Sequence, residues 1–283
     1  MITRFLRRTL LSAFACVVCL AAPASAQPAK SCGERIELAG HDNVRLPYSL
    51  HVPAKAVMVL VLLPGGPGFA DLDQSGCARK LSGNWLIRAR ELFHEQGFAT
   101  ALIDAPADHR GEDGLGGFRI APQHAEDIGK IITDIRRRTK LPVWVIGTSR
   151  GTISAANAAA RLRGEAAPEG VVFTSPVTSG RVGGRKAWVA QTVQSLSLEA
   201  IKMPVLVVAH ANDTCIRTPP RLAASILERT AGAREQLVIV KGGAGQRLPA
   251  DEDACRGRSH HGFIGREAEV TAGILRFIRG GSY

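Results

Sequence analysis

The stretch around Ser149 constrains the fold of this chain most. An apolar run typical of a buried strand, residues 143–147, leads into Gly-Thr-Ser-Arg-Gly and then into small residues typical of a helix. Two glycines beside a serine let the backbone turn sharply and hold the hydroxyl out at the turn. The amides of the following helix then lie behind the serine, where negative charge develops in acyl transfer. Because glycine and serine are common, the preceding strand carries the argument.

A nucleophilic serine needs a base, and the base needs an acid that orients it. A second apolar run, residues 203–210, ends just before Asp213. His260 and His261 follow in a glycine-rich loop before the last predicted helix. Asp213 as a turn residue and the histidines as surface residues are the alternatives. The chain order serine, acid, histidine, each placed between a strand and a helix, favours a catalytic triad.

An oxyanion hole is predicted upstream of the serine. The apolar run of residues 56–63 opens into Pro-Gly-Gly-Pro-Gly, which begins at Pro64. Glycines there let backbone amides approach a substrate oxygen, and the Arg150 amide would supply a second donor. A plain glycine-proline turn is the alternative. The position after the strand that precedes the first predicted helix favours the oxyanion hole.

With these features the chain resembles the α/β-hydrolase family over nearly all of its length after the N-terminal segment. The resemblance implies that Ser149 is the nucleophile, that His261 is the general base and acid, and that Asp213 orients the imidazole. His261 is preferred to His260 because it directly precedes Gly-Phe.

The resemblance also assigns the oxyanion hole to the backbone amides of Gly66 and Arg150. Many esterases and lipases of the family have a histidine where this chain has Pro64. That departure leaves Gly65 open as the donor in place of Gly66.

Strand patterns alternating with helix patterns predict an α/β fold with a mostly parallel central sheet of about eight strands and helices on both faces. The first two strands would form its antiparallel edge. The predicted strands lie near residues 35–38, 44–52, 56–63, 99–104, 143–147, 171–174, 205–209 and 236–240. The predicted helices lie near residues 85–96, 124–139, 150–163, 221–230 and 266–279.

The N-terminus predicts export. Three arginines precede an apolar stretch, residues 9–22, and a small-residue cleavage site that ends at Ala26. We interpret residues 1–26 as a signal peptide, too short to serve as a membrane span, and expect a periplasmic or secreted protein. An adjacent arginine pair leaves the twin-arginine route open beside the general one. Residues 27–283 would form a single domain, with no later membrane span.

Four cysteines remain after the signal peptide, which allows three pairings. The fold implied by the resemblance pairs Cys215 with Cys255, which would tie the acid loop to the histidine loop. Cys32 and Cys77 would then tie the N-terminal strand to the segment after the oxyanion loop. An oxidising compartment disfavours free thiols, and no cysteine pair after the signal peptide has the C-x-x-C spacing typical of zinc sites.

Residues 177–201 occupy the position where this family inserts its cap. The segment is short, with one helix predicted near residues 187–196, and we expect an open site. Removing the three N-terminal arginines leaves a formal charge of about +8 from +11. Arg181 and Arg185 lie in the cap, and the hypothesis is that they favour anionic substrates. The alternative is that they are solvated. The basic residues are scattered and aromatic residues are few, which argues against nucleic-acid binding.

These features favour an exported serine hydrolase that cleaves small carboxylic esters through an acyl-enzyme, without a metal or organic cofactor. A peptidase or amidase with the same residues is the first alternative, and the short cap argues against it. A non-catalytic binding protein of the same fold is the second, and the intact serine, acid and histidine set argues against it. The sequence does not indicate the oligomeric state.

Overall fold

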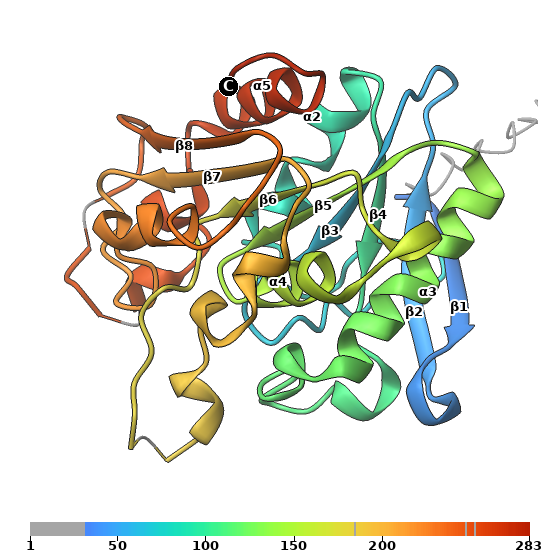
Figure 1. The fold of residues 1–283 in the computed structure, drawn as a ribbon, viewed down its shortest axis with the longest axis horizontal. Coiled ribbons are helices and arrows are strands. Elements are labelled where there is room, and N and C mark those ends of the chain that lie inside the picture. The colour runs from blue at the N-terminus through green and yellow to red at the C-terminus, as the bar shows by residue number, and fades with distance from the viewer. Residues whose placement is uncertain (1–31, 184, 247, 252) are drawn as a thin grey trace, which may run out of the picture. The chain divides into compact units, whose positions relative to one another are not determined.

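Eight strands pair into one sheet in the computed structural model, in the order β1-β2-β4-β3-β5-β6-β7-β8 (Figure 1). The structure describes residues 32–283 except 184, 247 and 252, so the predicted signal peptide lies outside the described residues. The strands are β1 (Glu34–Ala39), β2 (Arg45–His51), β3 (Val59–Leu63), β4 (Ala99–Ile103), β5 (Val143–Thr148), β6 (Gly170–Thr174), β7 (Val205–His210) and β8 (Glu235–Val240).

The sheet is parallel from β4 to β8, and β2 pairs antiparallel with both β1 and β4. Strands β3 to β7 are buried on both faces and read as continuous apolar runs, such as Val-Leu-Val-Leu-Leu in β3. The predicted eight-strand, mostly parallel sheet with an antiparallel edge is therefore confirmed.

Helices cover both faces of the sheet (Figure 1). One apolar core lies between the sheet and helices α3 and α4, and a second lies between the sheet and helices α1, α2 and α5. This two-sided arrangement is the one that the alternating pattern predicted. The helices are α1 (Trp85–Arg88), α2 (Arg90–Glu95), α3 (Pro122–Thr139), α4 (Gly151–Arg161) and α5 (Glu267–Ile278). Residues Ser31–Tyr283 form one compact unit.

Three predicted helices differ from the observed elements. The helix expected at 85–96 is interrupted at Ala89, whose ψ of 0° departs from helical geometry. The helix expected at 221–230 is a 3₁₀ helix at Pro220–Ile226. The helix expected at 187–196 is wrong, because two 3₁₀ helices, Ala187–Ala190 and Val193–Ser195, replace it.

A local side-chain bond explains the break in the segment of residues 177–201. The hydroxyl of Thr192 accepts a hydrogen bond from the Gln194 amide at 3.1 Å, while the Thr192 amide donates to Ser195 Oγ. Threonine and serine side chains offer the backbone an alternative to α-helical bonding, and here they start a new turn.

Short 3₁₀ helices complete the described chain, at His41–Asn43, Ala107–His109, Phe118–Ile120, Gly164–Ala166, Leu198–Ala200, Asp253–Cys255 and His260–Gly262. Within the described range, no helix combines the length and apolarity that a membrane crossing requires.

Candidate active site

Ser149 lies on a tight turn between β5 and α4. Its φ is 51°, in the left-handed region, and its amide donates to the Thr174 carbonyl at 3.0 Å. A Cβ on Gly65 would come within 2.8 Å of the Ser149 Cβ, and a Cβ on Gly151 would overlap the carbonyl oxygen of Leu63. The strand, the turn and the oxyanion loop therefore pack so closely that only glycine fits beside the serine.

His261 and Asp213 form a buried pair beside this turn. His261 Nδ1 lies 3.0 Å from Asp213 Oδ2, and the two side chains are 3% and 0% exposed. The other carboxylate oxygen, Oδ1, accepts from the Cys215 amide at 2.9 Å. Because Nδ1 faces a carboxylate, the proton of the neutral imidazole lies on Nδ1. The lone pair is then on Nε2, as a general base requires.

Thr218 also holds this pair, and its position gave no sequence signal. Its hydroxyl donates to Asp213 Oδ2 at 2.8 Å and lies 3.0 Å from His261 Nδ1. Ser175, at the end of β6, donates through its hydroxyl to the His261 carbonyl at 2.8 Å. The acid and histidine loops are thus positioned by one hydroxyl from the acid loop itself and one from the end of β6.

The second histidine of the loop has a different environment. The His260 ring stacks on His210 with 4.6 Å between ring centroids. His210 accepts from the Asn212 amide and donates to the Gly242 carbonyl, so its ring is fixed at both nitrogens. Only His261 of the two loop histidines bonds to Asp213.

Two disulfides tie the segments around the site, with the pairing that the sequence analysis expected. Cys215–Cys255 joins the loop of Asp213 to the loop of His261 across a sequence separation of 40. Cys32–Cys77 joins the start of β1 to the segment that follows the oxyanion loop across a separation of 45.

Gly66 and Arg150, the predicted oxyanion-hole residues, line the pockets at Ser149. Gly66 has a φ of 57°, and the Gly65 carbonyl is used in a turn to the Gly68 amide at 3.1 Å. Arg150 immediately precedes α4. Within the described ranges, neither the Gly66 amide nor the Arg150 amide donates to a protein acceptor. Both donors therefore stay available to a ligand oxygen beside Ser149, as an oxyanion hole needs.

A buried arginine, Arg119, hydrogen-bonds to the loop that begins at Pro64 and is predicted to supply the oxyanion hole. The sequence analysis did not single it out. Arg119 is 2% exposed and its Nη2 donates to the carbonyls of Pro64 and Gly66, at 3.2 and 3.3 Å. Its Nη1 donates to Ser154 Oγ at 2.6 Å. No carboxylate in the described chain forms an ion pair with it. Burial, with a smaller contribution from the Arg150 charge, lowers the pKa of Arg119.

Two pockets meet at Ser149. The glycine pocket, of about 220 Å³, is lined by Ser149 and His261 together with backbone from Gly65, Gly66, Gly257 and Gly262. Trp85 also lines it, and its indole N–H donates to the hydroxyls of Thr148 and Thr174 at 3.0 and 3.1 Å. Ser149 and His261 thus share one small pocket.

The second pocket at Ser149 has a volume of about 410 Å³, and we call it the cationic pocket. It is lined by Ser149, Arg150, Lys186, Trp188 and Arg217, among others. The Arg150 guanidinium lies 4.3 Å from the centre of the Trp188 ring. Burial, followed by the Arg217 charge, lowers the pKa of Arg150 to about 10. Lys186 pairs with Asp113 and, at 3.2 Å, with Glu112.

Arg181 and Arg185 are exposed and line neither pocket. Among the described residues, the cations that line the cationic pocket are Arg150 just before α4, Lys186 just before the 3₁₀ helix Ala187–Ala190, and Arg217 in the loop after Asp213. The cap therefore contributes Lys186 and Trp188 to the site, in place of the two arginines that the sequence analysis chose.

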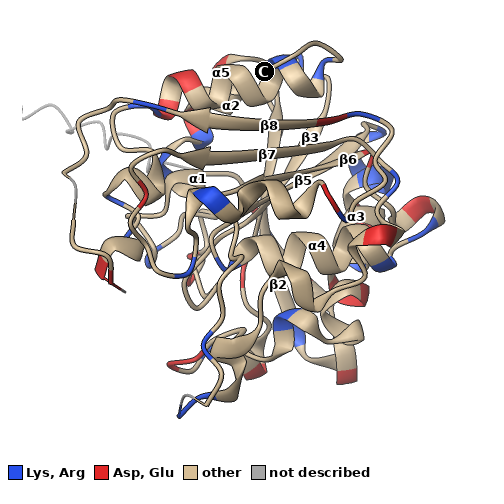
Figure 2. Cartoon of the chain, turned by 60° about the vertical axis from the view of Figure 1, so that its left-hand side comes forward, with Lys and Arg blue, Asp and Glu red and all other residues tan. Residues whose placement is uncertain are grey.

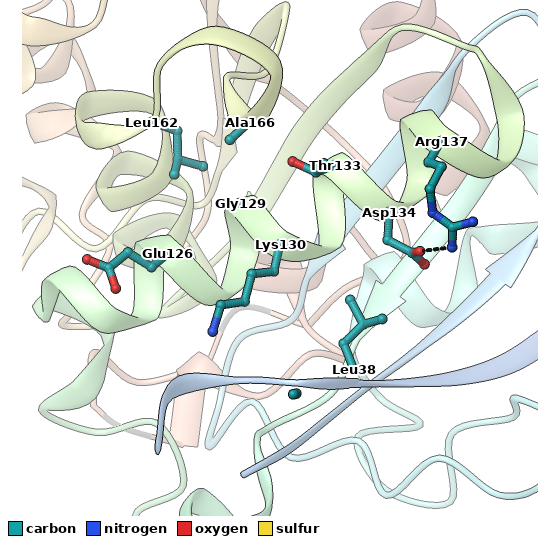
Figure 3. A pocket seen from close by; sticks show the side chains of 10 residues that line it. Leu38, Glu126, Gly129, Lys130, Thr133, Asp134, Arg137, Leu162 and Ala166 are labelled. Carbon is teal, nitrogen blue, oxygen red and sulfur yellow. Dashed lines mark hydrogen bonds and ion pairs between the residues drawn. The ribbon is translucent and has the colours of Figure 1, made fainter. Parts of the chain in front are cut away.

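A larger hollow, of about 720 Å³, lies away from these residues (Figure 3). It runs between Leu38 at the end of β1, the outer side of α3 and the segment around Leu162 and Ala166. Charged side chains of α3 lie around it, including the Asp134–Arg137 ion pair at 2.6 Å. Because it shares no lining residue with the pockets at Ser149, its size does not bear on the chemistry of the serine.

Solved structures with low sequence identity share this fold. The dienelactone hydrolase from Anabaena variabilis is 18% identical, with 86% of this chain and 95% of that chain covered and a TM-score of 0.55. The Pyrococcus furiosus esterase Pf2001 is 14% identical, with 87% and 91% covered and a TM-score of 0.60. Est1E from Butyrivibrio proteoclasticus is 15% identical, with 87% and 98% covered and a TM-score of 0.53.

No protein-family model and no curated protein sequence matches this chain. The structural matches show that the chain has the α/β-hydrolase fold, as predicted. A shared fold does not specify a reaction, so function has to be argued from the site itself.

Proposed function

We propose that this chain is a serine hydrolase that cleaves small carboxylic esters through an acyl-enzyme on Ser149. The observation that carries the proposal is the placement of Ser149 and His261 in one small pocket, with Asp213 bonded to the far nitrogen of the imidazole. A partly buried serine on a turn with positive φ, beside a histidine held by a carboxylate, is the arrangement that activates a hydroxyl for attack.

In the first step, Ser149 Oγ attacks the ester carbonyl carbon while His261 Nε2 takes the hydroxyl proton. The carbonyl oxygen becomes an oxyanion that accepts from the Gly66 and Arg150 amides. The tetrahedral intermediate then breaks its bond to the leaving oxygen, and His261 returns the proton to the departing alcohol. Water repeats the attack on the acyl-serine and releases the acid.

Asp213 and Thr218 keep the imidazole in the required tautomer, because both oxygens face Nδ1. Asp213 also stabilises the imidazolium that forms during each step. Arg119 acts as a positioning residue for the oxyanion loop, because its guanidinium holds the Pro64 and Gly66 carbonyls on the side away from the reacting carbonyl. None of these steps uses a metal ion or an organic cofactor.

The cationic pocket suggests the substrate class. Arg150, Lys186 and Arg217 lie around a space that opens on Ser149, and Trp188 adds an aromatic wall. Such a pocket favours esters that carry a carboxylate close to the scissile bond, since guanidinium and ammonium groups attract it and guanidinium binds it in two-point contacts. The apolar ring of Trp188 would pack on the carbon chain between the two groups.

An oxidising, extracytoplasmic location fits the two disulfides, because such bonds persist outside the cytosol. Lysine and arginine are interspersed with aspartate and glutamate along the elements in Figure 2. This distribution agrees with a small-molecule substrate and gives no support for a nucleic-acid partner.

The direct test is labelling of the oxidised protein with a fluorophosphonate, a probe that reacts with activated serines. Wild type should label, and both Ser149→Ala and His261→Ala should not. The matched control is His260→Ala, which removes a neighbouring buried imidazole that does not contact Asp213, and which should still label. Circular dichroism confirms that each variant is folded.

A panel of p-nitrophenyl and dicarboxylic monoesters, followed by aminoacyl amides, then defines the reaction. Faster turnover of esters than of matched amides supports the proposal. Well-folded wild type that neither labels nor hydrolyses any member would contradict it and favour a non-catalytic binding protein. Labelling with faster turnover of amides would replace the esterase by a peptidase or amidase on the same residues.

A further inference from the structure

A cluster of two histidines and a carboxylate lies outside the active site. His41 belongs to the short turn between β1 and β2, and Asp108 and His109 belong to the loop after β4. One ligating atom from each of the three lies within 4.8 Å of those of the other two. Segments more than sixty residues apart in sequence thus bring three metal-ligand side chains to one point.

The spacing of the three side chains fits a small cation. His41 Nε2 lies 2.9 Å from Asp108 Oδ2, and His109 Nε2 lies 3.8 Å from the same oxygen. In a tetrahedral zinc site with bonds of about 2.0–2.1 Å, neighbouring ligand atoms are about 3.3 Å apart. The observed separations bracket that value, so small side-chain movements would bring all three atoms to one ion.

A buried carboxylate orients His41 from behind. Asp127, whose side chain is 2% exposed, accepts from His41 Nδ1 at 2.6 Å through Oδ2 and from the His41 amide at 2.7 Å through Oδ1. A carboxylate on the far nitrogen of a metal-binding imidazole fixes its tautomer and its direction. The Asp127 contact therefore leaves Nε2 of His41 aimed at Asp108 and His109.

Phe118 packs against both imidazoles. Its ring stacks on His109 with 4.1 Å between centroids and a 20° interplanar angle, and it lies 4.7 Å from the centroid of His41. The side chains of Asp108 and His109 are 41% and 26% exposed, so the outer side of the cluster is open to solvent. An ion can reach the three atoms, and water can complete its coordination.

The charges and the ligand atoms of this cluster favour one kind of metal ion. The carboxylates of Asp108 and Asp127 carry two negative charges, and Lys130, 3.7 Å from Asp127 Oδ1, offsets one of them. A bound cation would require both imidazoles in their neutral form. Imidazole nitrogens bind zinc and related transition metals, whereas calcium and magnesium prefer all-oxygen sites. We propose that His41, Asp108 and His109 form a binding site for Zn²⁺, with Asp127 as the orienting carboxylate and water as the remaining ligand.

This zinc site would be structural. It would join the β1–β2 turn to the loop after β4, and through Asp127 to α3. Asp213, Cys215 and His261 also bring three ligand-type atoms together at the active site. They form a poorer zinc site, because the Cys215 sulfur is in a disulfide. The proposal is independent of the esterase function.

The test uses the oxidised chain without a polyhistidine tag. Zinc affinity is measured by competition with a chromophoric chelator, and Co²⁺ absorption reports the ligand geometry. Wild type should bind one zinc, and His109→Asn should bind at least tenfold more weakly. His109 is chosen because its removal leaves the His41–Asp127 contact intact. Zinc at a hundredfold excess over Kd should raise the Tm of wild type by roughly 5 °C or more, and calcium should not.

Two controls locate the ion. His51→Asn removes an imidazole that stacks on His94 at 4.0 Å, away from the cluster, and should keep wild-type zinc affinity. His261→Ala should also keep it, which separates this site from the triad. Loss of binding in His261→Ala with retention in His109→Asn would overturn the proposal. Absence of stoichiometric zinc binding by wild type would show that His41 only bridges two carboxylates.

Discussion

The strand ends around Ser149 and the cap segment of residues 177–201 are built in different ways. At the strand ends the geometry comes from the backbone and from covalent bonds: Ser149 has a positive φ, glycines pack against it, and a disulfide joins the acid and histidine loops. Among its described residues the cap has only short 3₁₀ helices. Its backbone bonds to the loop after Asp213, where the Arg217 carbonyl accepts from two cap amides, and Lys186 and Trp188 reach the site through their side chains.

This difference suggests a division of roles between the two regions. A backbone-held cluster keeps reacting groups within the narrow geometry that acyl transfer needs. A segment that lines the site through side chains can change this lining without disturbing that cluster. Substitutions at the strand ends should therefore change the rate with every ester, whereas substitutions in the cap should change which ester is preferred.

The largest effect is expected from the triad. Ser149→Ala and His261→Ala should each lower kcat by roughly 10⁴- to 10⁶-fold, because either change removes the activated nucleophile. Steady-state kinetics with a neutral and an anionic ester should show the same loss for both substrates. A loss confined to one substrate would mean that the strand-end cluster also selects the ester, and the proposed division would fail.

The next effect is expected from Arg119. Arg119→Met should lower kcat by roughly 10- to 100-fold with little change in KM, because the Pro64 and Gly66 carbonyls lose the donor that fixes the oxyanion loop. Rates are normalised to the concentration of serine that a fluorophosphonate titrates. Arg119→Lys, which keeps the charge and one donor, should recover part of the loss.

Arg90 is the matched control for that variant. It is another buried arginine, 5% exposed, whose pKa burial lowers to about 10, and it donates to the Cys32 carbonyl and to Ser49 Oγ. Arg90→Met should lower Tm as Arg119→Met does but leave kcat near wild type. Equal kcat losses in both variants would show that Arg119 contributes only to the stability of the fold.

The two disulfides allow a comparison of covalent bonds of similar loop size. Replacing either cysteine pair by serines should lower the free energy of unfolding by up to about 4 kcal/mol in the chain-entropy treatment. Only the Cys215–Cys255 replacement should also lower kcat, since it alone joins the acid and histidine loops. Urea denaturation and initial rates check the two effects separately. Similar kcat values in both variants would show that Thr218 and Ser175 position His261 without the disulfide.

The smallest effect is expected in the cap. Lys186→Met should raise KM for an anionic ester by roughly fivefold, since a solvent-screened charge contributes little, and should leave a neutral ester unchanged. Arg181→Ala with Arg185→Ala is the control, because both side chains are exposed and line neither pocket. A larger KM effect from the arginine pair than from Lys186 would restore the sequence-based hypothesis for those two residues.

The strand positions, the antiparallel edge of the sheet and the three proposed catalytic residues could be predicted from the sequence because each carries a local signal. Strands β3, β5 and β7 are continuous apolar runs, which are typical of buried parallel strands. Parallel strands bring the residues after their carboxyl ends to one edge of the sheet. Ser149 and Asp213 each follow such a run. The serine also has flanking glycines that make the turn recognisable.

The supporting residues had no such signal. Thr218 and Arg119 act through contacts with segments distant in sequence, and a single threonine or arginine looks the same whether it is exposed or buried. The 3₁₀ turns of the cap were missed because Thr192 and Ser195 compete with helical bonding, which residue propensities alone do not predict. The ligands of the proposed zinc site were likewise dispersed along the chain.

The close packing of glycines around Ser149 also sets limits on sequence change. Positions 65, 147 and 151 have no room for a methyl group, whatever substrate is chosen. Libraries aimed at new ester preferences should keep those three positions constant and randomise Lys186 and Trp188, whose side chains line the cationic pocket. The positions open to such change therefore lie in the cap, away from the glycine-packed turn of the proposed nucleophile.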